Sequence, residues 1–89
     1  MTYSIRPEDQ ARLDNLFSYH APFGDQAQRY ETIRASGGAF AEVLMEMCPP
    51  SAERTLAIRD IEMAVMRANQ SIAVNEIETV QGGTIAVGN

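Results

Sequence analysis

The residues best suited to chemistry stand in one stretch, from Tyr19 to Arg34, which reads YHAPFGDQAQRYETIR. It holds the only histidine of the chain, His20, together with aromatic rings and arginine. A ring that stacks, a guanidinium that bonds to phosphate and a helix start with free N–H groups together suit a small anion with flat rings. A tightly packed corner has the same composition, so a ligand site and a structural bend both stay open at this point.

The middle of this stretch predicts a fixed bend. Pro22 disfavours helix at the residue before it, and Gly24 accepts backbone angles that other residues avoid. Asp25 is a good N-cap for a helix that begins at Gln26. We therefore expect Tyr19 and His20 to lie on the bend near a helix N-terminus, with His20 hydrogen-bonded within the bend rather than catalytic.

The chain lacks the working parts of an enzyme. It has one histidine and one cysteine, far apart, without zinc-ligand spacing or a glycine-rich phosphate loop. Glu42 and Glu46 fall on a predicted helix surface and lack the Glu-x-x-His pattern of di-metal bundles. Cys48, before two prolines, is either a structural residue or a reactive thiol. We predict a binding protein with no catalytic residue, no cofactor and no metal.

Composition limits the partners. The 89 residues predict one domain, and a net charge of −5 argues against binding long nucleic acid through its phosphates. All seven basic residues are arginine. No apolar run is long enough to span a membrane, and a single cysteine fits a reducing cytoplasm.

The periodicity predicts an all-α fold. A short helix begins near Pro7, and two long helices, residues 26–47 and 52–74, follow as an antiparallel hairpin because Pro49-Pro50 and the N-cap Ser51 allow only a short connection. We expect residues 1–76 to form the hairpin domain and residues 77–89 a C-terminal tail. Residues 81–83 form a turn or joint, which leaves two alternatives for the tail: it is flexible, or it contains one short strand at 84–87.

Apolar stripes predict how the hairpin packs. One seam runs along the first long helix and a second along its partner; their positions are Tyr30, Ile33, Gly37, Phe40, Leu44 and Met47, and Ala57, Ile61, Ala64, Ala68 and Ile72. Gly37-Gly38 lies mid-helix, where either a neighbour approaches closely or the helix breaks. Leu56, Met63 and Met66 fall outside the stripe, so either further copies of the chain or the N-terminal helix cover them.

The arginines divide by position. Arg29 and Arg34 are five residues apart and therefore point to different sides of the helix, one toward this chain's bend and the other toward a neighbour's. Arg67 and Asn69 offer a guanidinium and an amide that can bond to a phosphate or a base edge. We expect Arg54 and Arg59 to be solvated.

Several motifs together resemble the small phage-encoded sponges of the anti-CBASS and anti-Thoeris families. The resemblance covers roughly residues 13–76, and the motifs that carry it are Phe17-Ser18-Tyr19-His20-Ala21-Pro22, Gly24-Asp25-Gln26, Arg29-Tyr30, Ile33-Arg34, Pro50-Ser51, Glu53, Ala68-Asn69, Ile72-Ala73 and Asn75-Glu76.

The resemblance implies a homohexamer that binds cyclic oligonucleotides in the cytoplasm of the infected bacterial host without cleaving them, and so blocks CBASS-type signalling. A cGAMP-like dinucleotide would lie between paired protomers, with Tyr19 stacking on a base, Arg34 at phosphate and His20, Ala21 and Pro22 lining the pocket. A cA3-like trinucleotide would occupy a separate site with Arg67 and Asn69. The alternatives are a sponge for cyclic ADP-ribose isomers and an oligomeric adaptor for a host protein.

Overall fold

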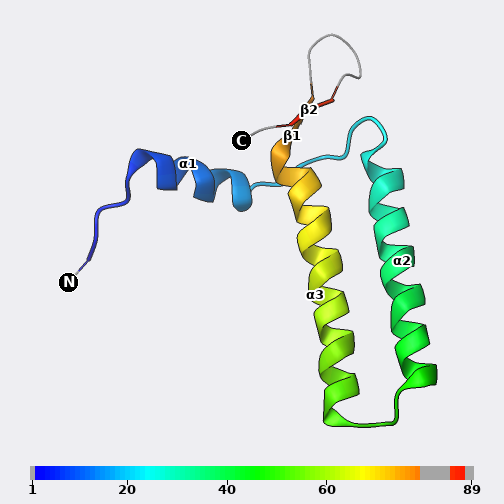
Figure 1. Ribbon diagram of the computed structural model, residues 1–89. Helices are drawn as coiled ribbons and strands as arrows, with labels where there is room; N and C mark the ends of the chain where they lie inside the picture. Colours follow the sequence, from blue (N-terminus) through cyan, green and yellow to red (C-terminus); the bar gives the residue numbers. More distant parts are fainter. Residues whose placement is uncertain (1, 79–84, 88–89) are drawn as a thin grey trace.

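The computed structural model describes residues 2–78 and 85–87, which form three helices and a pair of short strands (Figure 1). Helix α1 spans Pro7–Leu16, α2 spans Gln26–Met47 and α3 spans Ala52–Asn75. In Figure 1, α2 and α3 lie side by side and antiparallel, and α1 projects sideways from the end of the hairpin at which α2 begins and α3 ends. The all-α prediction with a helical hairpin is confirmed.

Local signals set the helix limits. Pro7 occupies the first turn of α1, where its missing N–H costs nothing, and the limits of α2 agree with those that the sequence predicts. The Ser51 hydroxyl accepts a hydrogen bond from the Arg54 amide at 3.1 Å, so it caps α3 as expected. Helix α3 runs one residue further than predicted, to Asn75.

Arg54 corrects a prediction. It is half-buried rather than solvated, and its Nη1 donates to the carbonyl oxygens of Met45 and Cys48 at 3.3 and 3.2 Å. These carbonyls belong to the last turn and C-cap of α2, which lack partners within the helix. Arg54, at the start of α3, therefore caps the C-terminus of α2. It can do so because the chain reverses direction between the two helices.

Gly37 explains how closely the two long helices approach. The helix continues through Gly37-Gly38, and a Cβ at Gly37 would clash with Cγ2 of Val65 and lie 3.6 Å from Cγ2 of Ile61. At Gly38 a Cβ would meet nothing within 4 Å. Close approach by α3 at Gly37 is thus confirmed, and a helix break is excluded.

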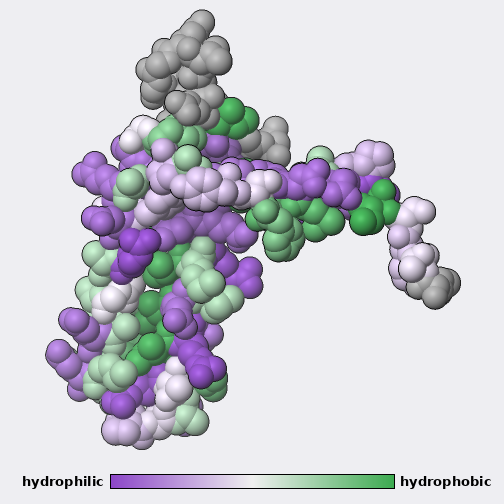
Figure 2. Space-filling model, turned by 180° about the vertical axis from the view of Figure 1, so that it is seen from behind, coloured by the Kyte–Doolittle hydropathy of each residue, from purple (hydrophilic) through white to green (hydrophobic). Residues whose placement is uncertain are grey.

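The hairpin leaves its apolar faces open. Among residues 2–77 no apolar side chain is fully buried, and Leu56, Met63 and Met66 are exposed. Figure 2 shows apolar atoms along the hairpin and on the lower side of α1. The radius of gyration is 17.5 Å, against about 12 Å for a compact domain of this length. The alternative that α1 covers Leu56, Met63 and Met66 is wrong, because all three side chains are exposed.

The tail contains the short strand predicted near 84–87, together with a partner strand that the sequence did not predict. Strand β1, Glu76–Glu78, follows α3 directly and pairs antiparallel with β2, Ile85–Val87, with Ile77 opposite Ala86. A single strand is unstable because its backbone groups lack hydrogen-bond partners. Here β1, formed by the residues that directly follow α3, provides those partners for β2. The predicted joint at 81–83 and Thr84 lie outside the described residues.

Candidate functional site

The bend between α1 and α2 is anchored by one buried side chain. Gln26 is 2% exposed, and its Oε1 accepts from the amide of Phe23 at 3.1 Å while its Nε2 donates to Oε1 of Glu76 at 3.2 Å. Gly24 has a φ of 57°, in the left-handed region that favours glycine. The predicted fixed bend is confirmed, and it is tied to the end of α3 as well as to the start of α2.

Arg29 and Glu76 complete this anchor. Nη1 of Arg29 donates to Oε2 of Glu76 at 2.8 Å, and Nη2 donates to Oε1, so the pair is bidentate. Nε of Arg29 donates to Oδ1 of Asp25 at 3.1 Å. Asp25 is the N-cap residue, as predicted, but its carboxylate makes no cap bond and bonds to Arg29 instead. Arg29 therefore belongs to the bend of its own chain.

The contacts shift the pKa values of both charged groups. The hydrogen bond from Arg29 lowers the pKa of the Glu76 carboxyl below its ordinary value, against the opposing effect of desolvation. The hydrogen bond to Glu76 raises the pKa of the Arg29 guanidinium. Both groups are thus held in their charged forms, and we refer to Gln26, Arg29 and Glu76 as the anchor cluster.

The residues expected to line a dinucleotide pocket lie on the outer side of this anchor. Tyr19 is 87% exposed, Ala21 and Pro22 are exposed, and Nε2 of the half-buried His20 donates to the carbonyl oxygen of Asn15 at 2.7 Å. His20 is thus hydrogen-bonded, as predicted, but its partner belongs to α1 rather than to the bend itself.

Arg34 lies apart from them on α2. It is exposed and makes no ion pair with any residue of the described ranges. It stands eight residues after Gln26, or about 12 Å along the helix axis. One chain does not close a pocket around Tyr19 and Arg34, so their meeting at one ligand stays a prediction that needs a second copy.

Arg67 and Asn69 lie together on α3. Both line a cavity of about 540 Å³ with Met63, Met66 and Gln70. Oδ1 of Asn69 is buried and has no hydrogen-bond partner in the described part of the chain. A buried acceptor without a donor is costly, so Asn69 is an unsatisfied polar residue beside this cavity.

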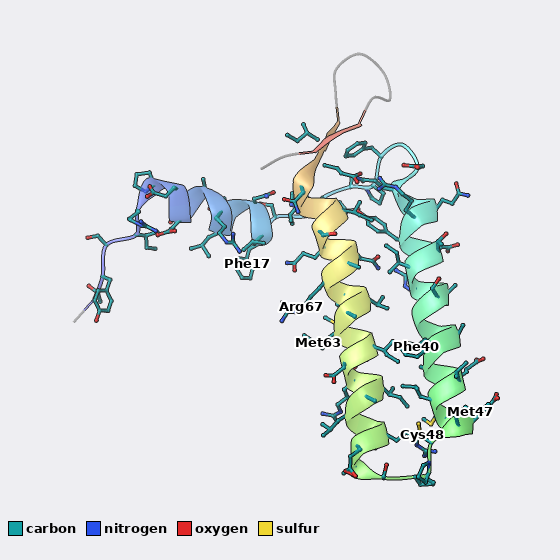
Figure 3. The ribbon with its side chains drawn as sticks, viewed as in Figure 1. Phe17, Phe40, Met47, Cys48, Met63 and Arg67 are labelled. Atoms are coloured by element: carbon teal, nitrogen blue, oxygen red, sulfur yellow. The ribbon has the colours of Figure 1, made fainter. Side chains whose placement is uncertain are left out.

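Figure 3 relates this surface to α1. Arg67 and Met63 point from α3 toward the side on which α1 projects, and Phe17 points from the end of α1 into the same space. A second cavity, of about 670 Å³, lies between α1 and α3 and includes Arg67, Gln70 and Arg12 in its lining. Arg67 is thus shared by two adjoining hollows.

Sequence reasoning missed the anchor cluster and Arg12. Gln26, Arg29 and Glu76 all belong to the motifs that carry the family resemblance, and that resemblance was the one sequence signal for them. Their mutual contact could not be predicted, because Glu76 lies 47 residues from Arg29. No periodicity joins positions so far apart. Arg12 carried no signal beyond its charge.

This arrangement defines a class: an open helical hairpin with a side-projecting N-terminal helix, uncovered apolar faces and free arginines beside hollows. The family model described as "Acb2/Tad1, hairpin domain" matches residues 9–73. The chain therefore belongs to the Acb2/Tad1 family of phage anti-defence sponges, which sequester signals rather than convert them.

Searches of curated proteins and of solved structures gave no match. No helix in residues 2–78 has the length and apolar character needed to cross a membrane.

Proposed function

We propose that this protein binds and sequesters cyclic dinucleotide and cyclic trinucleotide second messengers without cleaving them, and thereby blocks CBASS-type signalling in the cytoplasm of the infected host. The observation that carries the proposal is membership of the Acb2/Tad1 family over residues 9–73. The free rings, guanidiniums and amides described above provide the contacts.

The dinucleotide site uses Tyr19 and Arg34, with His20, Ala21 and Pro22 beside the ring. The Tyr19 ring is free to stack, which contributes about 1–3 kcal/mol per base in nucleic-acid complexes. Arg34 makes no ion pair in the described ranges, whereas Arg29 is held by Glu76. Of these two arginines, Arg34 is therefore the one available to a phosphate.

The trinucleotide site uses Arg67 and Asn69. The guanidinium suits a phosphate, and the side-chain amide of Asn69 suits a base edge. Both lie on α3, whereas the dinucleotide residues lie on the bend and on α2, so we assign the two ligands to separate sites.

The sites form in a homo-oligomer, which we propose to be a hexamer. Uncovered apolar side chains and a radius of gyration of 17.5 Å are typical of a chain that completes its core with further copies. A dinucleotide between two copies would meet each contributing residue twice.

Calorimetry with cyclic GMP–AMP tests the proposal. Tyr19→Ala and Arg34→Ala are each expected to abolish measurable binding while the oligomer stays intact by light scattering. Tyr3→Ala and Arg59→Ala replace exposed residues outside the site and serve as matched controls. Undiminished affinity in both site variants would reject the assignment.

Recovery of the ligand separates a sponge from an enzyme. Denaturing the complex and measuring the nucleotide by mass spectrometry should return it unchanged, because the chain offers no catalyst at the bend. Linear or hydrolysed product would instead show a phosphodiesterase.

An adaptor for a host protein is the second candidate. It is favoured by an apolar groove of about 620 Å³ between α2 and α3, lined in part by Ile33, Phe40 and Ile61. A thermal-shift panel of cyclic dinucleotides, cyclic trinucleotides and cyclic ADP-ribose isomers distinguishes the cases. No stabilisation by any of them would reject the sponge, and stabilisation by the ADP-ribose isomers would indicate an anti-Thoeris activity.

A further inference from the structure

The charged residues that line the cleft between α1 and α3 are two arginines and one glutamate. The net charge of the protein is −5, yet both Arg12 of α1 and Arg67 of α3 line this cleft of about 670 Å³. Its volume lies in the range typical of small-molecule sites, about 300–1,000 Å³.

Neither cleft arginine is neutralised by the protein. Within residues 2–78, Arg6 and Arg29 form the ion pairs, and Arg12 and Arg67 form none. Glu8 also lines the cleft, but its carboxylate pairs with Arg6, at 3.5 Å. Two like charges beside one hollow repel each other, and an anion between them would remove that repulsion.

A hydrogen bond joins the α1 wall of the cleft to α3. Nδ2 of Asn15 donates to the carbonyl oxygen of Val74 at 2.9 Å, which ties the last turn of α1 to the last turn of α3. Arg12 is three residues before Asn15 and therefore lies on the same face of α1. Gln70, opposite on α3, makes no side-chain hydrogen bond in the described ranges and leaves an amide free.

We propose that Arg12 is a second phosphate ligand of the site to which Arg67 belongs, so that the α1–α3 cleft holds a phosphodiester of the cyclic trinucleotide between two guanidiniums. This inference rests on the proposed function and adds α1 to the trinucleotide site. Each guanidinium presents a planar fork of N–H donors that matches two phosphate oxygens. Gln70 supplies an amide that can bond to a base edge.

The test compares three matched variants, Arg12→Gln, Arg67→Gln and Arg59→Gln. Arg59 is an exposed arginine of α3 that lines neither hollow. Titration calorimetry uses cyclic triadenylate and, separately, cyclic GMP–AMP. Arg12→Gln and Arg67→Gln are each expected to weaken cyclic triadenylate binding by about tenfold or more, while cyclic GMP–AMP binding stays within about twofold of wild type.

Cyclic triadenylate binding by Arg12→Gln that equals that of Arg59→Gln would overturn the inference. So would an equal loss of both nucleotides with a lowered melting temperature, because that pattern marks a structural role. If Arg12→Gln does not fold, Arg12→Lys replaces it; an ammonium lacks the planar fork, and a severalfold loss confined to cyclic triadenylate is expected. Wild-type protein that binds neither nucleotide would overturn the proposed function itself.

Discussion

Helix α3 makes two contacts of opposite character, one with α2 and one with α1. Against α2 it is closed at two places, where Val65 fills the space at Gly37 and where Glu76, just beyond the helix, is bonded to Arg29 and Gln26. An apolar groove of about 620 Å³ lies along the same pair of helices, but none of the described residues that line it is an unpaired arginine. Against α1 it is open, with one hydrogen bond from Asn15 beside a hollow of about 670 Å³.

The difference separates architecture from candidate function. In the closed contact the polar groups satisfy each other, so their loss should lower stability. In the open contact Arg12 and Arg67 form no ion pair within residues 2–78, so their loss should lower ligand affinity instead.

The largest effect on stability is expected for Gln26→Ala. It removes two hydrogen bonds and leaves the Phe23 amide without its side-chain acceptor, so the free energy of unfolding should fall by about 2–3 kcal/mol. Urea unfolding at a fixed protomer concentration measures it. The control is Gln28→Ala, an exposed glutamine of the same helix. Equal unfolding midpoints for the two variants would show that the anchor cluster does not close the hairpin.

The two glycines of α2 should respond in opposite directions. Gly37→Ala overpacks against Val65, a β-branched residue with little rotamer freedom in a helix, and should cost about 1–2 kcal/mol. Gly38→Ala has open space and should gain up to about 1 kcal/mol from helix propensity. The melting temperatures of both variants, compared with wild type, test this prediction. A shift in the same direction for both would contradict the packing described at Gly37. Dissociation of the oligomer by Gly38→Ala would place another copy at this face.

Acid should open the closed contact in a defined pH window. The pKa of Glu76 is lowered on folding from an ordinary value of 4.5, so the unfolded chain takes up the proton first as pH falls. The stabilisation is therefore complete above about pH 4.5 and is lost as pH drops through the lowered folded-state pKa. Melting temperatures of wild type and Glu76→Gln should converge across this window. A constant difference down to low pH would contradict the assignment.

The smallest effect on stability is expected for Asn15→Ala. The lost bond to Val74 is exposed and should cost under about 1 kcal/mol, yet α1 loses its fixed approach to α3. Affinity for cyclic triadenylate should fall severalfold. Gln10→Ala, which removes a bond within α1 to Asp14, is the control. A large loss of stability without loss of affinity would show that the α1–α3 contact serves the architecture rather than ligand binding.

The helix limits were predictable because their causes are local. Pro7, Ser51 and the prolines after Cys48 act on backbone within one turn of themselves, so the limits of α2 agree with prediction and α3 differs by one residue. The place of the bend followed from Gly24 for the same reason. The sequence by itself therefore determined the hairpin.

Tertiary structure alone decided which polar side chains are already used. Arg29 and Arg34 look alike in sequence, but only Arg29 meets Glu76, because α3 returns the chain to the start of α2 after 47 residues. Arg54 closes the end of α2 for the same reason, and Arg12 lines a cleft with Arg67 because Asn15 ties α1 to the end of α3. Such pairings depend on where distant segments meet in space, and no local pattern records that.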